Sequence, residues 1–286
     1  MEKYDLHTHF FTNWAKGRYS LERKPRTPKV ILDAIRKARL DGVVLCSAGD
    51  EGTNKDVYEQ FAEASKYKEN CGGYSLTKEI GNALIFEDSE GALKVIKGQE
   101  VLTGQGHIVA IGLEKGEIIK SNLGIEKTLK EIKSVGAISD ADHYKGFCGI
   151  GEINLSRYAY DGLIDVFESF NANYTHSLLS SVLGLNPINE EGEELESLLC
   201  INGISVSDCH NRRDVGNGHI EVENGSIDFS TSDNLKESLK KVLEWGEFDR
   251  VERKGNSLKS ILEHSFIALY DFHIRNKLGW TDIERW

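Results

Sequence analysis

Short apolar runs alternate along the chain with stretches in which apolar residues recur every three or four positions. Residues 3–7 are typical of a short strand, and a polar, aromatic loop follows from Phe10 to about Pro28. Beyond Pro28 the apolar positions have helical spacing, Gly42 ends that pattern, and Val43–Cys46 is an apolar run. The beginning of the chain therefore predicts a strand, a helix and a second strand.

The same alternation continues to about residue 207. Further strands are predicted near 92–96, 108–113, 137–141, 163–167 and 201–207, and helices near 125–135, 174–183 and 190–199. Strands that alternate with helices usually form a parallel sheet whose faces the helices cover. We therefore expect an α/β fold with a mostly parallel sheet.

Two segments fall outside this alternation. Residues 54–90 form an insertion between two predicted strands, helical and acidic up to residue 70, which we interpret as a passive surface excursion rather than a lid. After residue 231 two helical patterns follow, and we expect both to pack on the α/β unit. Because the chain has three prolines and no low-complexity tract, residues 1–231 and the helices of 232–286 are expected to form one domain.

The composition is typical of a globular protein of the cytoplasm. The 286 residues, of which 39% are hydrophobic, suffice for a large core. The start of the chain has no basic and apolar leader pattern, and no apolar stretch approaches the roughly 20 residues that span a bilayer. Five cysteines without a C-x-x-C pair argue against a disulfide framework and a cysteine zinc site. We therefore expect a cytoplasmic protein without membrane contact.

Two histidines lie at the end of the first predicted strand, in the run His7-Thr8-His9. Because alternate residues of a strand point to the same side, both imidazoles can face one pocket and offer two nitrogen donors. A pair of surface histidines spaced by one residue would give the same pattern, so this run does not identify a site by itself.

A carboxylate and an imidazole with the same spacing follow the last predicted strand. Asp208 and His210 come directly after the apolar run 201–206, so both can point to one side, and this combination suits a divalent ion. Glu100 lies after another apolar strand, where its carboxylate could bridge two metals. His107 opens the next strand, and His143 follows the strand of residues 137–141. A histidine that is simply hydrogen-bonded in a loop would also account for His143.

Five of the nine histidines thus lie at predicted strand termini. In a sheet or barrel of parallel strands, the side chains at the carboxyl ends of the strands converge on one edge. The sequence therefore predicts a centre with more than one metal ion, built from residues that lie far apart in the chain.

In their order along the chain these residues resemble the polymerase and histidinol phosphatase (PHP) family. The resemblance covers residues 5 to about 216 and rests on these motifs: Asp5-Leu6-His7-Thr8-His9, Gly98-Gln99-Glu100-Val101, Gly106-His107-Ile108-Val109, His143 and Ser207-Asp208-Cys209-His210-Asn211. The segments 164–171 and 212–216 are also similar to family segments. The resemblance implies a distorted (β/α)7 barrel with an added C-terminal helical segment. It also implies hydrolysis of phosphate esters with two or three metal ions, commonly manganese, zinc or iron.

The resemblance also implies roles for individual residues. One metal would be held by His7, His9, Glu100 and Asp208, and Glu100 would bridge to a second metal that is also held by His107 and His143. His210 would belong to a third metal. The loop after His9 and the run 47–51 lack the histidines and aspartate that the family supplies there, so we expect two metals, with Asp50 or Glu51 as possible substitutes for the missing ligands.

Three cations and one cysteine lie beside these motifs. Lys145, Arg212 and Arg213 come just after strand ends that carry candidate ligands, where a cation could bind a substrate phosphate, although surface placement explains them equally well. Cys209 lies between two candidate ligands, so strand alternation predicts that its sulfur points away from the metals into the packing.

The sequence leaves three interpretations of function. The first is a phosphoesterase in which a metal-activated water attacks phosphorus. The second is a metal-dependent amidohydrolase, which also begins with an H-x-H motif and ends with a late aspartate. The third is a PHP-like module that binds a partner without catalysis. The formal net charge of −11 disfavours contact with long nucleic acids, so the expected substrate is a small phosphorylated molecule or a nucleotide.

Overall fold

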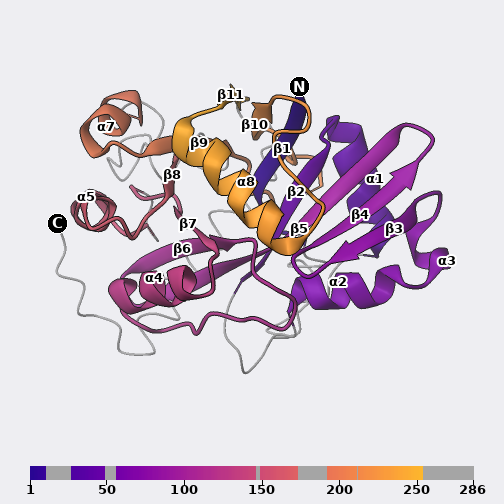
Figure 1. The fold of residues 1–286 in the computed structure, drawn as a ribbon, viewed down its shortest axis with the longest axis horizontal. Helices are drawn as coiled ribbons and strands as arrows, with labels where there is room; N and C mark the ends of the chain where they lie inside the picture. Colours follow the sequence, from indigo (N-terminus) through magenta and orange to yellow (C-terminus); the bar gives the residue numbers. More distant parts are fainter. Residues whose placement is uncertain (11–26, 49–55, 146–148, 173–191, 211, 254–286) are drawn as a thin grey trace.

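A computed structural model describes residues 1–10, 27–48, 56–145, 149–172, 192–210 and 212–253. It is a mixed α/β protein with a nearly closed, barrel-like sheet (Figure 1). The barrel strands follow one another in space in the order β1 (Glu2–Thr8), β2 (Gly42–Ala48), β5 (Gly91–Thr103), β6 (Gly106–Ile111), β7 (Ile138–Ala141), β8 (Val166–Asn171) and β9 (Asn202–Val206). A parallel bridge between Thr8 and Cys209 joins the last of these strands to the first.

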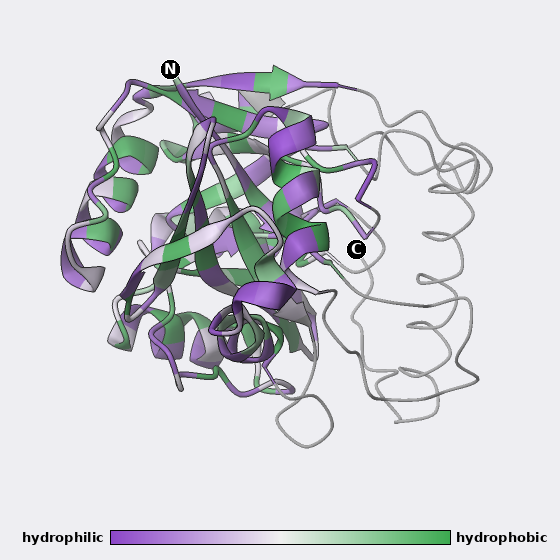
Figure 2. Cartoon of the chain, turned by 90° about the vertical axis from the view of Figure 1, so that its right-hand side faces the viewer, coloured by the Kyte–Doolittle hydropathy of each residue, from purple (hydrophilic) through white to green (hydrophobic). Residues whose placement is uncertain are grey.

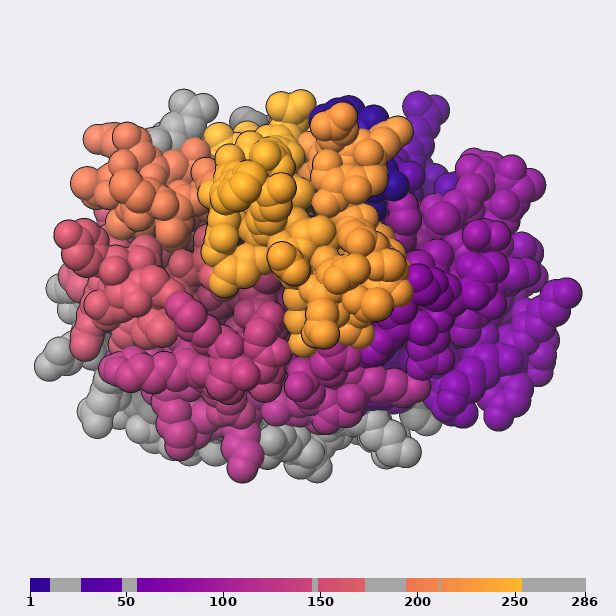
Figure 3. Space-filling model, viewed as in Figure 1, coloured from indigo at the N-terminus to yellow at the C-terminus, as the bar shows by residue number. Residues whose placement is uncertain are grey.

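Two further strand pairs extend this sheet. The strand β10 (Gly218–Val222) pairs with the other edge of β1, and β11 (Phe248–Glu252) pairs with β10. The hairpin of β3 (Ser75–Ile80) and β4 (Ala83–Asp88) is attached to β5 through β4. In the space-filling view the C-terminal part of the described chain, in orange and yellow, packs against the indigo N-terminal strand (Figure 3).

The expectation of a mostly parallel sheet is wrong. Among the ten strand pairs of the described residues, four are parallel and six are antiparallel. Short connections explain three of the antiparallel pairs, because a loop of only a few residues joins antiparallel strands, whereas a parallel pair needs a longer crossover. Residues 81–82, 89–90 and 104–105 join β3 to β4, β4 to β5 and β5 to β6 in this way. The strand β6 is also antiparallel to β7, although a long connection, residues 112–137, joins these two strands.

Helices pack around the barrel with their apolar faces inward (Figure 2). They are α1 (Pro28–Ala38), α2 (Val57–Ser65), α3 (Lys68–Cys71), α4 (Ile125–Ser134), α5 (Glu152–Tyr160), α7 (Gly192–Leu199) and α8 (Ser232–Trp245). The helix α1 has residues that favour helix ends: proline occupies its first turn, Arg36 and Lys37 lie in its last turn, and Arg39 ends it in the left-handed conformation. Its residues Ile31 and Ile35 are fully buried.

The interior of the barrel is apolar at the end where the parallel strands begin. This cluster includes Ile96, Val109, Ile138, Val166 and Ile204, together with Leu235, Leu239, Val242 and Leu243 of α8. The helix α8 closes this end, since the side chain of Asn202 at the start of β9 donates hydrogen bonds to the carbonyls of Leu243 and Glu244. The opposite end of the barrel is where the candidate ligands lie.

Several predicted elements differ in kind or extent from the observed ones. The first half of the insertion at 54–90 is helical as predicted and holds α2 and α3, but its second half is the unpredicted hairpin β3–β4, which pairs with the edge of β5. The first helical pattern after residue 231 is α8, whereas the second pattern and the helix predicted at 174–183 lie outside the described residues. Within the described part of the chain, no helix is both long and apolar enough to cross a membrane.

Candidate metal centre

All seven predicted ligands lie at one edge of the barrel. His7 belongs to β1 and His9 follows it, Glu100 and His107 belong to β5 and β6, and His143, Asp208 and His210 follow the ends of β7 and β9. The antiparallel direction of β6 explains why His107, at the beginning of its strand, reaches the same edge as residues at the ends of theirs. Among the described residues, four groups of histidine and acidic side chains are close enough to hold a metal ion, and these seven residues all belong to them.

A β-bulge aims the first two histidines into the barrel. The register between β1 and β2 shifts between Asp5 and Thr8, so β1 has one residue more than its partner there. In a regular strand His7 would point to the side opposite to its neighbour Leu6, which belongs to the apolar interior cluster. Because of the shift, both side chains are fully buried on the inner side of the sheet. The bulge therefore places ligands directly above the apolar core of the barrel.

The first group consists of His7, His9 and Glu100, with Asp208 beside it. The Nε2 atoms of His7 and His9 are 2.8 Å apart, and Nε2 of His9 lies 3.2 Å from Oε2 of Glu100. Oδ1 of Asp208 is 3.6 Å from Nε2 of His9 and 3.9 Å from Nε2 of His7. Two imidazole nitrogens and two carboxylate oxygens thus converge, which is a donor set suited to zinc or a related divalent ion.

The hydrogen bonds of the two rings indicate which nitrogens are available to a metal. Nδ1 of His7 lies 2.7 Å from Oε1 of Glu168, and Nδ1 of His9 lies 3.3 Å from the carbonyl oxygen of Cys46. Because both partners are acceptors, each Nδ1 is best protonated, which leaves a lone pair on each Nε2. Two ring nitrogens that face each other at 2.8 Å can share one cation, a proton when no metal is bound or a metal ion in its place.

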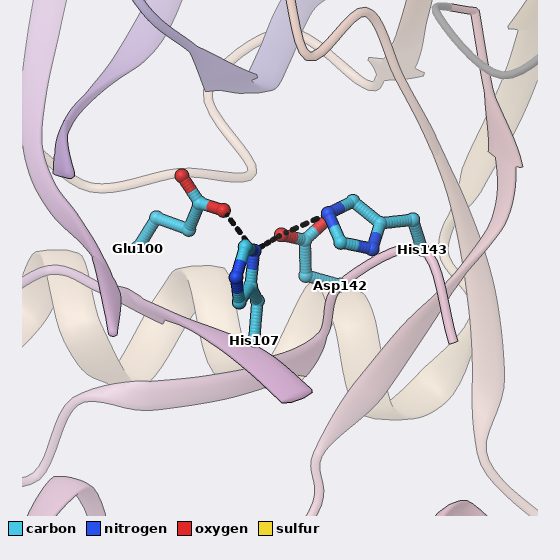
Figure 4. Close-up of side chains that lie close together, drawn as sticks. All are labelled: Glu100, His107, Asp142 and His143. Atoms are coloured by element: carbon cyan, nitrogen blue, oxygen red, sulfur yellow. Dashed lines mark ion pairs between the residues drawn. The ribbon is translucent and has the colours of Figure 1, made fainter. Parts of the chain in front are cut away.

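The second group consists of Glu100, His107, Asp142 and His143 (Figure 4). The carboxylates of Glu100 and Asp142 flank His107, whose Nδ1 lies 2.5 Å from Oε1 of Glu100 and 3.8 Å from Oδ2 of Asp142. Nε2 of His143 is 3.0 Å from the same Oδ2. Glu100 belongs to both groups, with Oε2 directed at His9 and Oε1 at His107.

The third group consists of His9, Asp208 and His210. Nδ1 of His210 lies 3.6 Å from Oδ1 of Asp208, and the rings of His9 and His210 have centroids 4.7 Å apart. His210 is the more exposed member, with 13% of its side chain accessible. Asp50 and Glu51, considered as substitutes for missing third-metal ligands, lie outside the described residues.

Two buried acids that the ligand prediction did not include belong to the same cluster. Asp142 contributes to the second group, and Glu168 forms the fourth group with His7 and Asp142. A signal for both was present in the sequence, because Asp142 directly precedes His143, and Glu168 interrupts an apolar strand two residues after Val166. Asp140, also fully buried, lies in β7, two residues before Asp142.

All three candidate phosphate-binding cations lie among the described residues. Nζ of Lys145 is 3.9 Å from Oε2 of Glu152 and 5.7 Å from the ring centroid of Tyr144. Arg212 and Arg213 are exposed. Cys209 is fully buried in the cluster that contains Leu45 and Val215, as strand alternation predicts, and burial raises the pKa of its thiol.

Burial and charge shift the pKa values of this cluster strongly. The pKa of Asp142 lies well above its usual range, because burial disfavours the carboxylate and Glu168 adds a like charge. Burial alone would lower the pKa of His7, but the charges of Asp208 and Glu168 outweigh it and raise that pKa to about 10. Burial and the charge of His107 lower the pKa of His143 to about 4.

Five buried acids therefore share a small space with neutral and charged imidazoles. They are Glu100, Asp140, Asp142, Glu168 and Asp208. Uncompensated carboxylates are costly in a protein interior, and the groups that lower the pKa values of Glu100 and Glu168 are histidines. Divalent cations would add positive charge to this cluster, so the residues present fit a metal centre.

Comparison of the sequence with protein-family models gives no match, and comparison with curated proteins gives none either. The structure, however, is similar to solved structures. PsfC from Pseudomonas syringae PB-5123 matches with a TM-score of 0.57 and 14% sequence identity over 96% of this chain and 98% of that chain. A two-domain protein from Bacteroides vulgatus ATCC 8482 that contains a predicted PHP-like metal-dependent phosphoesterase matches with a TM-score of 0.54 and 15% identity.

The second match covers 88% of this chain, which spans 65% of the length of that protein. At these identities the similarity shows the fold. The fold is that of PHP-type structures, as the sequence resemblance implies, and the candidate metal centre lies within it.

Proposed function

We propose that this protein is a metal-dependent hydrolase of phosphate esters, a phosphomonoesterase or nucleotide phosphoesterase. The observation that carries the proposal is the position of Glu100, whose two carboxylate oxygens face the histidines of two different groups. A carboxylate between two sets of imidazoles is the arrangement expected of a ligand that bridges two metals. The PHP-type fold supports phosphate esters as the substrate class.

The residues of the chain would hold two ions of manganese, zinc or iron. His7, His9, Glu100 and Asp208 would hold the first, and Glu100, His107, His143 and Asp142 the second. His210 is available to a third ion or to a substrate. When bound, such a pair of ions polarises phosphoryl oxygens and activates water as the nucleophile. These side chains lie at one edge of the nearly closed, barrel-like sheet, next to its apolar interior, which is compatible with the distorted (β/α)7 barrel that we propose.

The substrate we propose is a small phosphorylated molecule or a nucleotide. The net charge of −11 disfavours a long polyanion. Lys145, Arg212 and Arg213 remain candidates for contacting the phosphate, because Lys145 and Arg212 follow closely on ligands at this edge and arginine binds phosphate at two points.

Metal content and phosphate release test the proposal together. Purified protein should contain bound divalent metal by elemental analysis and should release phosphate from a generic ester when supplied with Mn²⁺ or Zn²⁺. His7→Ala and Asp208→Ala should each abolish this release, because each removes a proposed ligand of the first ion. The matched control is His219→Ala, since His219 is also buried but lies in β10 and bonds through Nδ1 to the carbonyl of Gly216.

The outcomes separate the competing interpretations. Absence of bound metal in the folded wild-type protein would support a non-catalytic module and overturn the proposal. Bound metal with cleavage of an amide substrate and no phosphate release would support the amidohydrolase. Unchanged phosphate release in both ligand variants would also overturn the assignment of the site.

A further inference from the structure

A single buried carboxylate contacts parts of both proposed metal sites. Glu168 lies in β8 and is fully buried. Its Oε1 accepts a hydrogen bond from Nδ1 of His7 at 2.7 Å. Its Oε2 accepts one from the backbone N–H of His143 at 2.8 Å and another from Nδ2 of Asn171 at 2.7 Å. Both oxygens are therefore occupied by nitrogen donors.

This occupancy distinguishes Glu168 from the ligands around it. His7, Asp142 and Glu168 are close enough to one another to hold a metal ion. However, Nδ1 of His7 directs its proton at Glu168, while Nε2 of the same ring faces the first group. A metal bound to either oxygen of Glu168 would have to displace the hydrogen bond or bonds made to that oxygen, which a buried carboxylate needs. The fourth group is therefore a support for the metal centre, not a further metal site.

The three donors link Glu168 to ligands from distant parts of the chain. His7 belongs to the first proposed site and His143 to the second. Asn171, which donates to Glu168, is also 3.3 Å from Oδ2 of Asp208 through the same Nδ2. A β-bulge between Glu168 and Phe170 shifts the register of β8, and both Glu168 and Asn171 are fully buried beside the ligands.

Two of these ligands have backbone conformations that need support. His143 has a φ of +25° and Asp208 a φ of +47°, in the left-handed region that residues with a side chain rarely adopt. Such residues keep this conformation when the surrounding structure fixes it. The hydrogen bond from the N–H of His143 to Glu168 provides this support for the second site, and Asn171 provides a contact to Asp208 in the first.

We propose that Glu168 is the positioning residue of the metal centre. It holds the tautomer and orientation of His7 and the backbone of His143, so that one side chain sets the geometry of both metal sites. This inference rests on the proposed function, because it requires that the centre binds metal.

The experiment compares Glu168→Gln with a matched control, Asp165→Asn. Asp165 is a suitable control because it lies three residues away and accepts hydrogen bonds from the N–H and the hydroxyl of Ser139 but contacts no candidate ligand. The full chain is stripped of metal and titrated with Zn²⁺ and, separately, Mn²⁺ in competition with a chelator. The affinity and the number of ions bound are the primary measurements.

We expect Glu168→Gln to bind metal about 10–100-fold more weakly, which is the usual effect of removing a residue that hydrogen-bonds to a metal-ligating histidine. Glutamine keeps an acceptor for His7 but places an NH₂ group against at least one of the other donors, so the loss should be largest at the site of His143. The ring N–H of His7, followed by ¹H–¹⁵N NMR, should remain strongly downfield in wild-type protein and in Asp165→Asn, and should shift in Glu168→Gln.

The possible results separate this inference from the proposed function. If the wild-type protein binds no metal, the proposed function fails. If the wild type binds metal and Glu168→Gln binds it equally well with an unshifted His7 resonance, the positioning role alone is overturned. If Glu168→Gln does not fold, Asn171→Ala takes its place, because it keeps Glu168 and removes its Nδ2 donor. Weaker metal binding by Asn171→Ala than by Asp165→Asn supports the inference, and equal binding overturns it.

Discussion

The two ends of the barrel interior differ sharply although the same strands form both. At one end Ile96, Val109, Ile138, Val166 and Ile204 form an apolar cluster against α8. A few residues further along the same or adjoining segments, Glu100, His107, Asp142, Glu168 and Asp208 form a cluster of buried acids and imidazoles. Each of these five strands therefore contributes one residue to the apolar cluster and, on the strand or just after it, one residue to the candidate site.

The difference shows how the fold can support a costly site. A cluster of buried carboxylates destabilises a metal-free protein, whereas burial of apolar side chains at the other end offsets that cost. Gly98 lies between the two ends on β5, where a side chain would collide with Val44 and would lie 2.9 Å from Sγ of Cys46. The polar end should therefore control metal and activity, and the apolar end should control stability.

The largest expected effect is on the polar end, at Glu100. Glu100→Gln removes the negative charge that both proposed metals share. We therefore expect phosphate release to fall by more than about 100-fold, which is more than the usual effect of losing a residue that only hydrogen-bonds to a metal ligand. Bound metal should fall from two ions toward one or none. Elemental analysis and an assay of released phosphate measure the two effects. A variant that keeps both metals and full activity would contradict the bridging role.

The apolar end should show the opposite response. Ile96→Ala removes a fully buried side chain from the lower cluster, and we expect the free energy of unfolding to fall by about 2–5 kcal/mol. The smaller change Ile96→Val should cost about 0.5–1.5 kcal/mol. Urea unfolding of metal-loaded protein measures both. The number of metal ions bound to the folded protein should stay the same, and a loss of metal would mean that the two ends are not separable.

The smallest effect concerns the helix that closes the apolar end. The side chain of Thr231 accepts a hydrogen bond from the N–H of Asn234 and caps α8. Thr231→Ala should lower the free energy of unfolding by about 1 kcal/mol, as is usual for the loss of such a cap. Thr231→Ser keeps the acceptor and serves as the control. Equal stability of the alanine and serine variants would show that this cap contributes nothing.

The sequence by itself predicted most of the residues that the structure brings together at the candidate metal centre. His7, His9, Glu100, His107, His143, Asp208 and His210 were predicted from their places at strand termini, and the structure brings them to one edge. This worked because hydrophobic periodicity is a local property, so it locates the end of a strand without knowledge of its neighbours. The resemblance to PHP-type structures is confirmed for the fold. Whether these residues bind metal stays a prediction.

Only the tertiary structure decided the directions of the strands and the supports of the ligands. The local pattern did not reveal that β6 runs antiparallel, nor that bulges in β1 and β8 turn His7 and Asn171 into the interior. Both depend on pairing between residues far apart in the chain, because one extra residue in a strand reverses the side on which every following side chain lies. For the same reason the carboxylate of Glu168, 161 residues from His7, could be identified as its partner only in three dimensions.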